Sequence, residues 1–145
     1  MFVGEYSHNI DAKGRIIIPA KLREQLGEHF MITKGLDGCL SLYTMDGWKE
    51  FESKIASLPT NQKNARYLQR AFLSGAAEAD PDKQGKVLIT PPHREYAALS
   101  KEVVIIGAGS HAEIWDAQRW AEYNTGSDVE MTLEEAAEAL EGINF

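Results

Sequence analysis

The stretch Asp11-Ala-Lys-Gly-Arg15-Ile-Ile-Ile-Pro19 returns, 71 positions later, as Asp82-Lys-Gln-Gly-Lys86-Val-Leu-Ile-Thr90-Pro91. The likeness continues past this motif through equivalent residues at an offset of 71 or 72: Arg23 with Arg94, Tyr43 with Trp115, and Trp48 with Trp120. Two copies are too few for a solenoid, which needs about three repeats. The sequence therefore predicts a duplicated unit of about 45 residues.

The chain of 145 residues has the length of one ordinary domain. Units of this size bury too little surface to be stable separately, so both copies are expected to share one core. We predict an α+β fold with a β-rich, pseudo-two-fold core of two tandem units and short flanking helices. The expected divisions are a first unit at residues 1–59, a helical linker at 60–79, a second unit at 80–125, and an acidic C-terminal helix and tail at 126–145.

Local patterns predict the individual elements. Short β-branched stretches predict strands at residues 2–6, 15–18, 29–34, 39–43 and 112–115, with a polar, turn-rich segment at 7–14. Apolar spacing predicts helices at 20–26 and 60–76, and a further helix that Asp46 caps. Thr132 and Glu135 form a capping-box pattern for a last helix at 133–140.

The net charge of −7 is concentrated at the C-terminal end. Residues 124–145 carry −6 with no Lys or Arg, which leaves about −1 for residues 1–123. A nearly neutral body can bind phosphate through clustered cations, because local patches decide contacts. The acidic tail is interpreted as a solvated end, with mimicry of nucleic acid as the alternative. The cations Lys63, Arg66 and Arg70 are interpreted as a solvated helix face, with an auxiliary phosphate or protomer contact as the alternative.

The repeated motif has the composition of a tight turn that opens a strand. Gly14 and Gly85 permit positive φ angles, so the chain can turn sharply at both places. Asp11 and Asp82 can accept backbone N–H bonds in such turns or pair with the basic residues that follow them. We expect these four residues to shape the turns, with an auxiliary role at DNA.

Each turn also presents basic side chains, and these are the predicted DNA contacts: Lys13, Arg15, Lys83 and Lys86. The Arg15 guanidinium can fork onto a phosphate or a guanine edge, whereas Lys86 offers a point charge. The first copy is therefore expected to specify sequence and the second mainly to position the protein. A surface ion pair between Arg15 and Asp11 is the alternative. Lys21 and Arg23 are auxiliary candidates, although packing or ion pairing is favoured for Arg23.

Other classes of function have weaker support. Gly107 and Gly109 imitate a dinucleotide fingerprint, but a strand rather than a helix is expected to follow them, as in the equivalent turn of the first copy. The four histidines and the one cysteine show no metal-ligand spacing, and no catalytic constellation is found. We expect no enzyme activity, no cofactor, no metal, no signal peptide and no membrane span.

The paired motif resembles the MraZ family, which is built from two AbrB-like swapped-hairpin halves. The resemblance covers about residues 1–125 and includes the start Met1-Phe-Val-Gly-Glu-Tyr6-Ser-His8. Two departures are that Lys86 replaces the usual second arginine and that Thr90 stands where proline would align.

This resemblance implies a bacterial transcriptional regulator, typically a repressor, of the division and cell-wall gene cluster. It implies binding to short direct repeats in promoter DNA as a ring of identical subunits, in the cytoplasm and at the nucleoid. The alternative is an oligomeric protein-interaction scaffold that uses the acidic tail and the basic linker helix without sequence-specific DNA binding.

Overall fold

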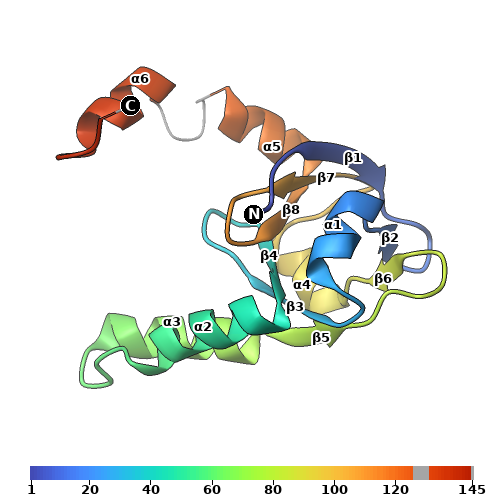
Figure 1. Cartoon of the computed structure of the whole chain (residues 1–145), viewed down its shortest axis with the longest axis horizontal. Coiled ribbons are helices and arrows are strands. Elements are labelled where there is room, and N and C mark those ends of the chain that lie inside the picture. Colours follow the sequence, from blue (N-terminus) through green and yellow to red (C-terminus); the bar gives the residue numbers. More distant parts are fainter. Residues whose placement is uncertain (126–130, 145) are drawn as a thin grey trace.

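The computed structural model describes residues 1–125 and 131–144, and it places their strands in two antiparallel sheets (Figure 1). The larger sheet has the strand order β1 (Glu5–Asn9), β7 (Glu102–Gly107), β8 (Ala112–Asp116), β4 (Leu40–Thr44), β3 (Phe30–Lys34), β5 (Ala77–Ala79). The smaller sheet pairs β2 (Arg15–Ile17) with β6 (Lys86–Leu88). The helices are α1 (Ala20–Leu26), α2 (Met45–Ala56), α3 (Lys63–Ser74), α4 (Pro91–Tyr96), α5 (Ala117–Asn124) and α6 (Leu133–Ala139).

The two copies exchange their first strands. Strand β1 of the first copy pairs with β7 of the second. Strand β5, the equivalent of β1 at the end of the expected linker, pairs with β3 of the first copy and so belongs structurally to the second copy. The strand order therefore reads the same from either edge when the copies are interchanged, and the hairpins β3–β4 and β7–β8 meet in the middle. This arrangement confirms the predicted α+β fold of two tandem units. It also means that neither copy completes its sheet without strands from the other.

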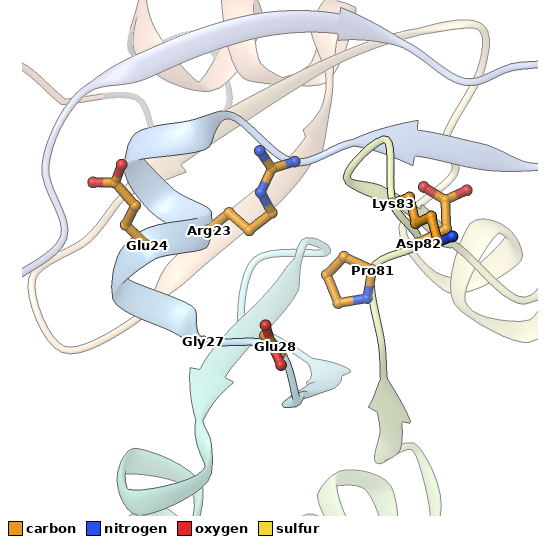
Figure 2. Close-up of a pocket in the computed structure, with 7 residues that line it drawn as sticks. All are labelled: Arg23, Glu24, Gly27, Glu28, Pro81, Asp82 and Lys83. Carbon is orange, nitrogen blue, oxygen red and sulfur yellow. The ribbon is translucent and has the colours of Figure 1, made fainter.

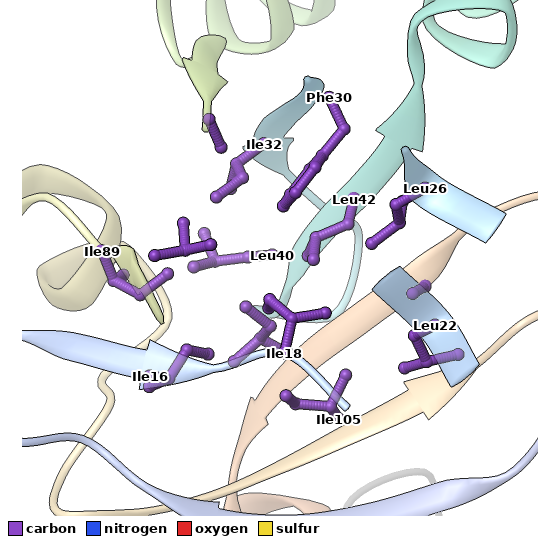
Figure 3. Packing of buried hydrophobic residues seen from close by; sticks show 14 of the residues in the cluster. Ile16, Ile18, Leu22, Leu26, Phe30, Ile32, Leu40, Leu42, Ile89 and Ile105 are labelled. Atoms are coloured by element: carbon purple, nitrogen blue, oxygen red, sulfur yellow. The ribbon is translucent and has the colours of Figure 1, made fainter. Parts of the chain in front are cut away.

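One buried core lies between the sheets and helices (Figure 3). Ile16 and Ile18 follow the first turn, and their equivalents Val87 and Ile89 follow the second. These four side chains pack with apolar residues of the central strands and of α1: Phe30, Ile32, Leu40, Leu42, Ile105, Leu22 and Leu26. Because both motifs contribute equally to one cluster, the copies share a core as the sequence predicts.

Two expectations about the first unit are wrong. The N-terminal strand is β1 at Glu5–Asn9 rather than residues 2–6, so the first three of the eight residues expected as turn-rich are paired with β7. Its side chains alternate between exposed and half-buried positions, and most of them are polar. The segment therefore lacks the apolar alternation by which a strand is recognised in a sequence. The N-cap of α2 is Thr44, whose hydroxyl accepts a bond from the Gly47 N–H, rather than Asp46.

The glycine turn after β7 is a hairpin, as predicted. Strand β8 returns directly to pair with β7, and Gly107 lies opposite Ala112. The N-terminal segment covers this turn, because Phe2 forms a bridge with Gly109. A Cβ added to Gly107 would lie 2.2 Å from the Val3 nitrogen, so only glycine allows this close approach. No helix begins after the glycines, and the dinucleotide interpretation loses its structural basis.

The remaining helices lie outside the core. Helices α2 and α3 pack on each other and project from one end of the sheet, while α6 stands away from the opposite end (Figure 1). One half of the predicted capping box is present, since the Thr132 hydroxyl accepts a bond from the Glu135 N–H; the Glu135 carboxylate accepts from the Thr132 hydroxyl rather than from its backbone N–H. Asp128 and Glu130, counted in the acidic tail, lie outside the described residues. Within the described part of the chain, no helix has the length and apolar character needed to cross a membrane.

Candidate nucleic-acid interface

The small sheet joins the two repeated motifs into one antiparallel ribbon. Ile16 of β2 lies opposite Val87 of β6 at its centre. Beyond the strand ends, the Ile18 N–H donates to the Gly85 carbonyl at 3.0 Å, and the Ile89 N–H donates to the Gly14 carbonyl at 2.9 Å. Each copy therefore hydrogen-bonds to the turn of the other, and the turns are fixed relative to one another.

The first turn is closed by Asp11. Its backbone N–H donates to the Arg15 carbonyl at 2.8 Å, and its Oδ1 accepts bonds from the Lys13 and Arg15 N–H groups at 2.9 and 2.8 Å. The Arg15 N–H bond, the Lys13 N–H bond and the Arg15 guanidinium lower the pKa of the Asp11 carboxyl, against the opposing effect of burial. The carboxylate thus shapes the turn and pairs with its basic residue as well.

The second turn repeats this geometry with the same backbone pattern. Asp82 N–H donates to the Lys86 carbonyl at 2.9 Å, and Asp82 Oδ1 accepts from the Gln84 and Lys86 N–H groups, both at 2.9 Å. The Lys86 N–H is the main cause of a lowered pKa at Asp82. Lys13 and Lys83 are exposed near the tips, and Lys86 is half-buried at the start of β6.

The cations of the two turns differ in their partners. Arg15 Nε lies 3.1 Å from Asp11 Oδ2, and Arg15 Nη1 lies 3.9 Å from Asp82 Oδ2, with about a third of both the Arg15 and Asp11 side chains exposed. The guanidinium is therefore held between carboxylates of both copies. Across residues 1–125 and 131–144, Lys13, Lys83 and Lys86 form no ion pair within 4.0 Å.

Two arginines pack crosswise against the turn glycines. Gly14 and Gly85 both have a φ of +81°, which favours glycine. A Cβ on Gly14 would lie 3.0 Å from Arg94 Nη1, and a Cβ on Gly85 would lie 1.5 Å from Arg23 Nη1. Each guanidinium thus lies against the turn of the other copy, which agrees with the packing role favoured for Arg23. Arg94 was absent from the predicted site, although its equivalence to Arg23 was a signal for it.

A cavity of about 660 Å³ opens beside the second turn (Figure 2). It lies between α1 and the segment leading into the second turn, and its charged lining residues are Arg23, Glu24, Glu28, Asp82 and Lys83. Its lining carries both signs of charge, so it does not by itself select an anion. The cavity gives the Arg23 side chain free space, so the guanidinium can move away from Gly85. Lys21 is exposed on α1, outside the lining of this cavity.

Comparison with known proteins matches the whole repeated unit twice. A family profile described as "MraZ protein, putative antitoxin-like" matches residues 1–71 and again residues 72–142. A protein named transcriptional regulator MraZ from Thermoanaerobacter sp. (strain X514) is 49% identical over 145 residues, which cover 100% of both chains. Proteins of the same name from Halothermothrix orenii and Heliobacterium modesticaldum are 51% identical over 100% of both chains and 53% identical over 97% of this chain and 96% of the relative.

Proposed function

The chain belongs to the MraZ family, and from that premise we propose that it is a transcriptional regulator that binds promoter DNA through the two turns of the β2–β6 ribbon. The finer proposal is a repressor of the division and cell-wall gene cluster that binds short direct repeats as a ring of identical subunits. It would act in the cytoplasm, at the nucleoid. Family membership supports the regulatory role, and the geometry of the ribbon supports the site.

The observation that carries the proposal is the rigid pairing of two basic turns. A sequence-reading side chain must reach the groove in a fixed orientation, and phosphate contacts provide that orientation. Backbone bonds between the copies fix both turns, and Asp11 and Asp82 fix the conformation within each. We propose that the Arg15 guanidinium makes a bidentate contact with a base edge or a phosphate. Lys13, Lys83 and Lys86 are proposed to contact phosphates.

The charge of the site explains why several subunits are needed. Four cations and two carboxylates give the two turns a net charge of only +2 per protomer. Affinity for DNA grows with the number of phosphates neutralised, so one protomer binds weakly at physiological salt. Linking protomers raises the effective concentration for repeated half-sites. We therefore propose that repeat spacing along the promoter matches protomer spacing in the ring.

The test begins with a selection of bound DNA from a random pool, which supplies the specific sequence. Fluorescence anisotropy then compares this duplex with a scrambled one over a salt series. Arg15→Ala is expected to reduce specific affinity by about 5- to 150-fold and to relax sequence preference. Lys83→Ala is expected to weaken both duplexes alike and to reduce the salt slope by about 1.

The matched control is Lys54→Ala, an exposed lysine on α2, which Figure 1 shows far from the ribbon. It should leave the affinity for both duplexes unchanged. If Arg15→Ala bound both duplexes like the parent protein, the site assignment would be wrong. If no sequence were enriched from the pool, the scaffold alternative would be preferred.

A further inference from the structure

The outward face of the β2–β6 ribbon carries two exposed aliphatic side chains. The inward face is made by Ile16 and Val87, which are 1% and 2% exposed. Because side chains alternate along a strand, the neighbours of these two residues point to solvent. Ile17 is 42% exposed and Leu88 is 54% exposed, although both are large and apolar. Neither belongs to the apolar cluster of the core, so both are available to a partner.

Each of these aliphatic side chains lies opposite a cation. Leu88 pairs with Arg15 across the ribbon. Ile17 pairs with Lys86 in the same way. Residues directly opposite one another in an antiparallel pair share a face, with Cβ atoms about 4.5–5.5 Å apart. The outward face therefore has two cations on one diagonal and two aliphatic groups on the other.

The pseudo-two-fold axis between the copies passes through the centre of this face. The offset of 71 carries Ile17 onto Leu88. The same offset carries Arg15 onto Lys86. Proteins with two-fold symmetry commonly bind DNA sequences that share this symmetry. The ribbon can therefore present one cation and one aliphatic side chain to each strand of a duplex.

We propose that Ile17 and Leu88 contact the C5-methyl groups of thymines in the major groove. This inference rests on the DNA binding in the proposed function and deepens it by naming two specificity-determining side chains. The thymine methyl is the apolar feature of the major groove, and an aliphatic side chain that packs on it favours thymine at that position. Arg15 and Lys86 then lie beside the same bases and contact polar edges or phosphates.

The charge around the aliphatic pair favours DNA as the occupant of this face. Arg15 and Lys86 are partly exposed on the face itself. Lys13 and Lys83 are exposed on the two turns, which lie at opposite ends of the ribbon. The carboxylates of the turns already accept backbone N–H bonds. An apolar centre surrounded by cations matches a groove with methyl groups on its floor and phosphates along its edges.

The dimensions of the ribbon also suit the major groove. Two paired strands lie about 4.8 Å apart, and the groove is about 12 Å wide, which admits a two-stranded ribbon. Ile17 and Leu88 are diagonal neighbours, and such residues are about 7–8 Å apart. This distance corresponds to about two base-pair steps of 3.4 Å. The selected DNA should therefore contain thymines on opposite strands, about two steps apart.

Removing single methyl groups from the DNA tests the contact. The duplex selected from the random pool is remade with one thymine at a time replaced by deoxyuridine, which lacks the C5-methyl group but keeps the hydrogen-bonding groups. Fluorescence anisotropy with the parent chain should show a loss of affinity of about fourfold at two positions, the size expected when one buried methyl group is removed. Substitution of the other thymines should have a smaller effect.

Two variants assign each methyl group to its side chain. Ile17→Ala should largely abolish the effect of one of the two deoxyuridines, and Leu88→Ala that of the other, because the group that contacted the methyl is absent. Leu73→Ala is the matched control, since Leu73 is also 42% exposed and lies on α3, which Figure 1 shows far from the ribbon. It should retain both effects. Circular dichroism and sedimentation velocity should show an unchanged fold and assembly for all three variants.

The outcomes distinguish this inference from the proposed function. Deoxyuridine effects that persist in both variants, or an enriched sequence without thymine in its core, overturn the inference and leave the proposed function standing. If Ile17→Ala or Leu88→Ala changed sedimentation while the deoxyuridine effects persisted, the face would contact another copy of the chain, which also overturns the inference. If no sequence is enriched from the pool, the proposed function fails and the inference fails with it.

Discussion

Replacing Gly85 by alanine tests the crosswise packing of the two copies. Gly85 has a φ of +81°, where an L side chain costs about 1–2 kcal/mol. The new Cβ would also lie 1.5 Å from Arg23 Nη1 and 2.8 Å from Arg23 Cζ, so the guanidinium must leave the turn. The cavity beside Arg23 gives it room, so we expect about 0.5–1 kcal/mol more for the lost packing rather than a failure to fold.

A double-mutant cycle separates the two contributions. Gly85→Ala should cost about 0.5–1 kcal/mol less in an Arg23→Ala background, because the displaced group is already absent. Gly109→Ala is the matched control, since its φ is +84° and an added Cβ meets nothing within 4 Å. It should show the backbone cost alone. Gly14→Ala should fall between these, because its Cβ lies 3.0 Å from Arg94 Nη1 and needs only a small displacement.

The assay is urea unfolding followed by circular dichroism at one fixed protomer concentration, because the proposed self-association would contribute to apparent stability. If Gly85→Ala cost the same with and without Arg23, the guanidinium would not lie on the turn of the other copy. The same would follow if Gly85→Ala cost no more than Gly109→Ala. Either result would refute the crosswise packing of the two arginines.

Three further predictions concern pH and packing. His29→Gln should remove a pH dependence, because Asp80 and, more weakly, Glu78 raise the pKa of His29 above its ordinary 6.5. The stabilisation is complete below about pH 6.5 and is lost as pH rises through the folded pKa, so urea midpoints of parent and variant should converge at alkaline pH. Asp11→Ala should behave in the opposite sense, because folding lowers the pKa of the Asp11 carboxyl below its ordinary 3.8. The parent protein should therefore be more stable than the variant above about pH 3.8, and this difference should disappear as the pH falls through the folded pKa. Acid titration followed by circular dichroism measures it, and a constant difference across the titration would contradict the role of the carboxylate in the turn. Leu42→Ala should cost about 2–5 kcal/mol in urea unfolding, because Leu42 is 0% exposed in the shared core; a cost below about 1 kcal/mol would argue against that packing.

Much of the turn geometry could be predicted because it is local. An Asp four residues before a basic residue, with glycine between them, can satisfy its own backbone N–H groups without help from the rest of the chain. The bonds from Asp11 and Asp82 follow that pattern in both copies. The hairpin at Gly107 was likewise predictable from its counterpart in the first copy, which showed that a strand follows the glycines.

The N-terminal strand could not be placed in the same way. Glu5–Asn9 is largely polar and alternates between exposed and half-buried positions, so its sequence shows little strand character. It forms a strand because β7, about 97 residues later, offers an unpaired edge. Pairing over such a distance is a property of the folded chain and leaves no periodic signal in the segment itself.

The sequence by itself determined that there are two equivalent units, that each has an Asp-closed turn with basic residues, and that both feed one apolar core. These features arise from residues within a few positions of each other, where backbone conformation and hydrogen bonding are decided locally. Only the tertiary structure decided that the units exchange strands, that Arg23 and Arg94 cross to the opposite turns, and that Asp82 lies near Arg15. These contacts join residues about 45 to 101 positions apart. They form because only one arrangement in space pairs all the strands and buries all the apolar faces, and no single segment of the sequence encodes that arrangement.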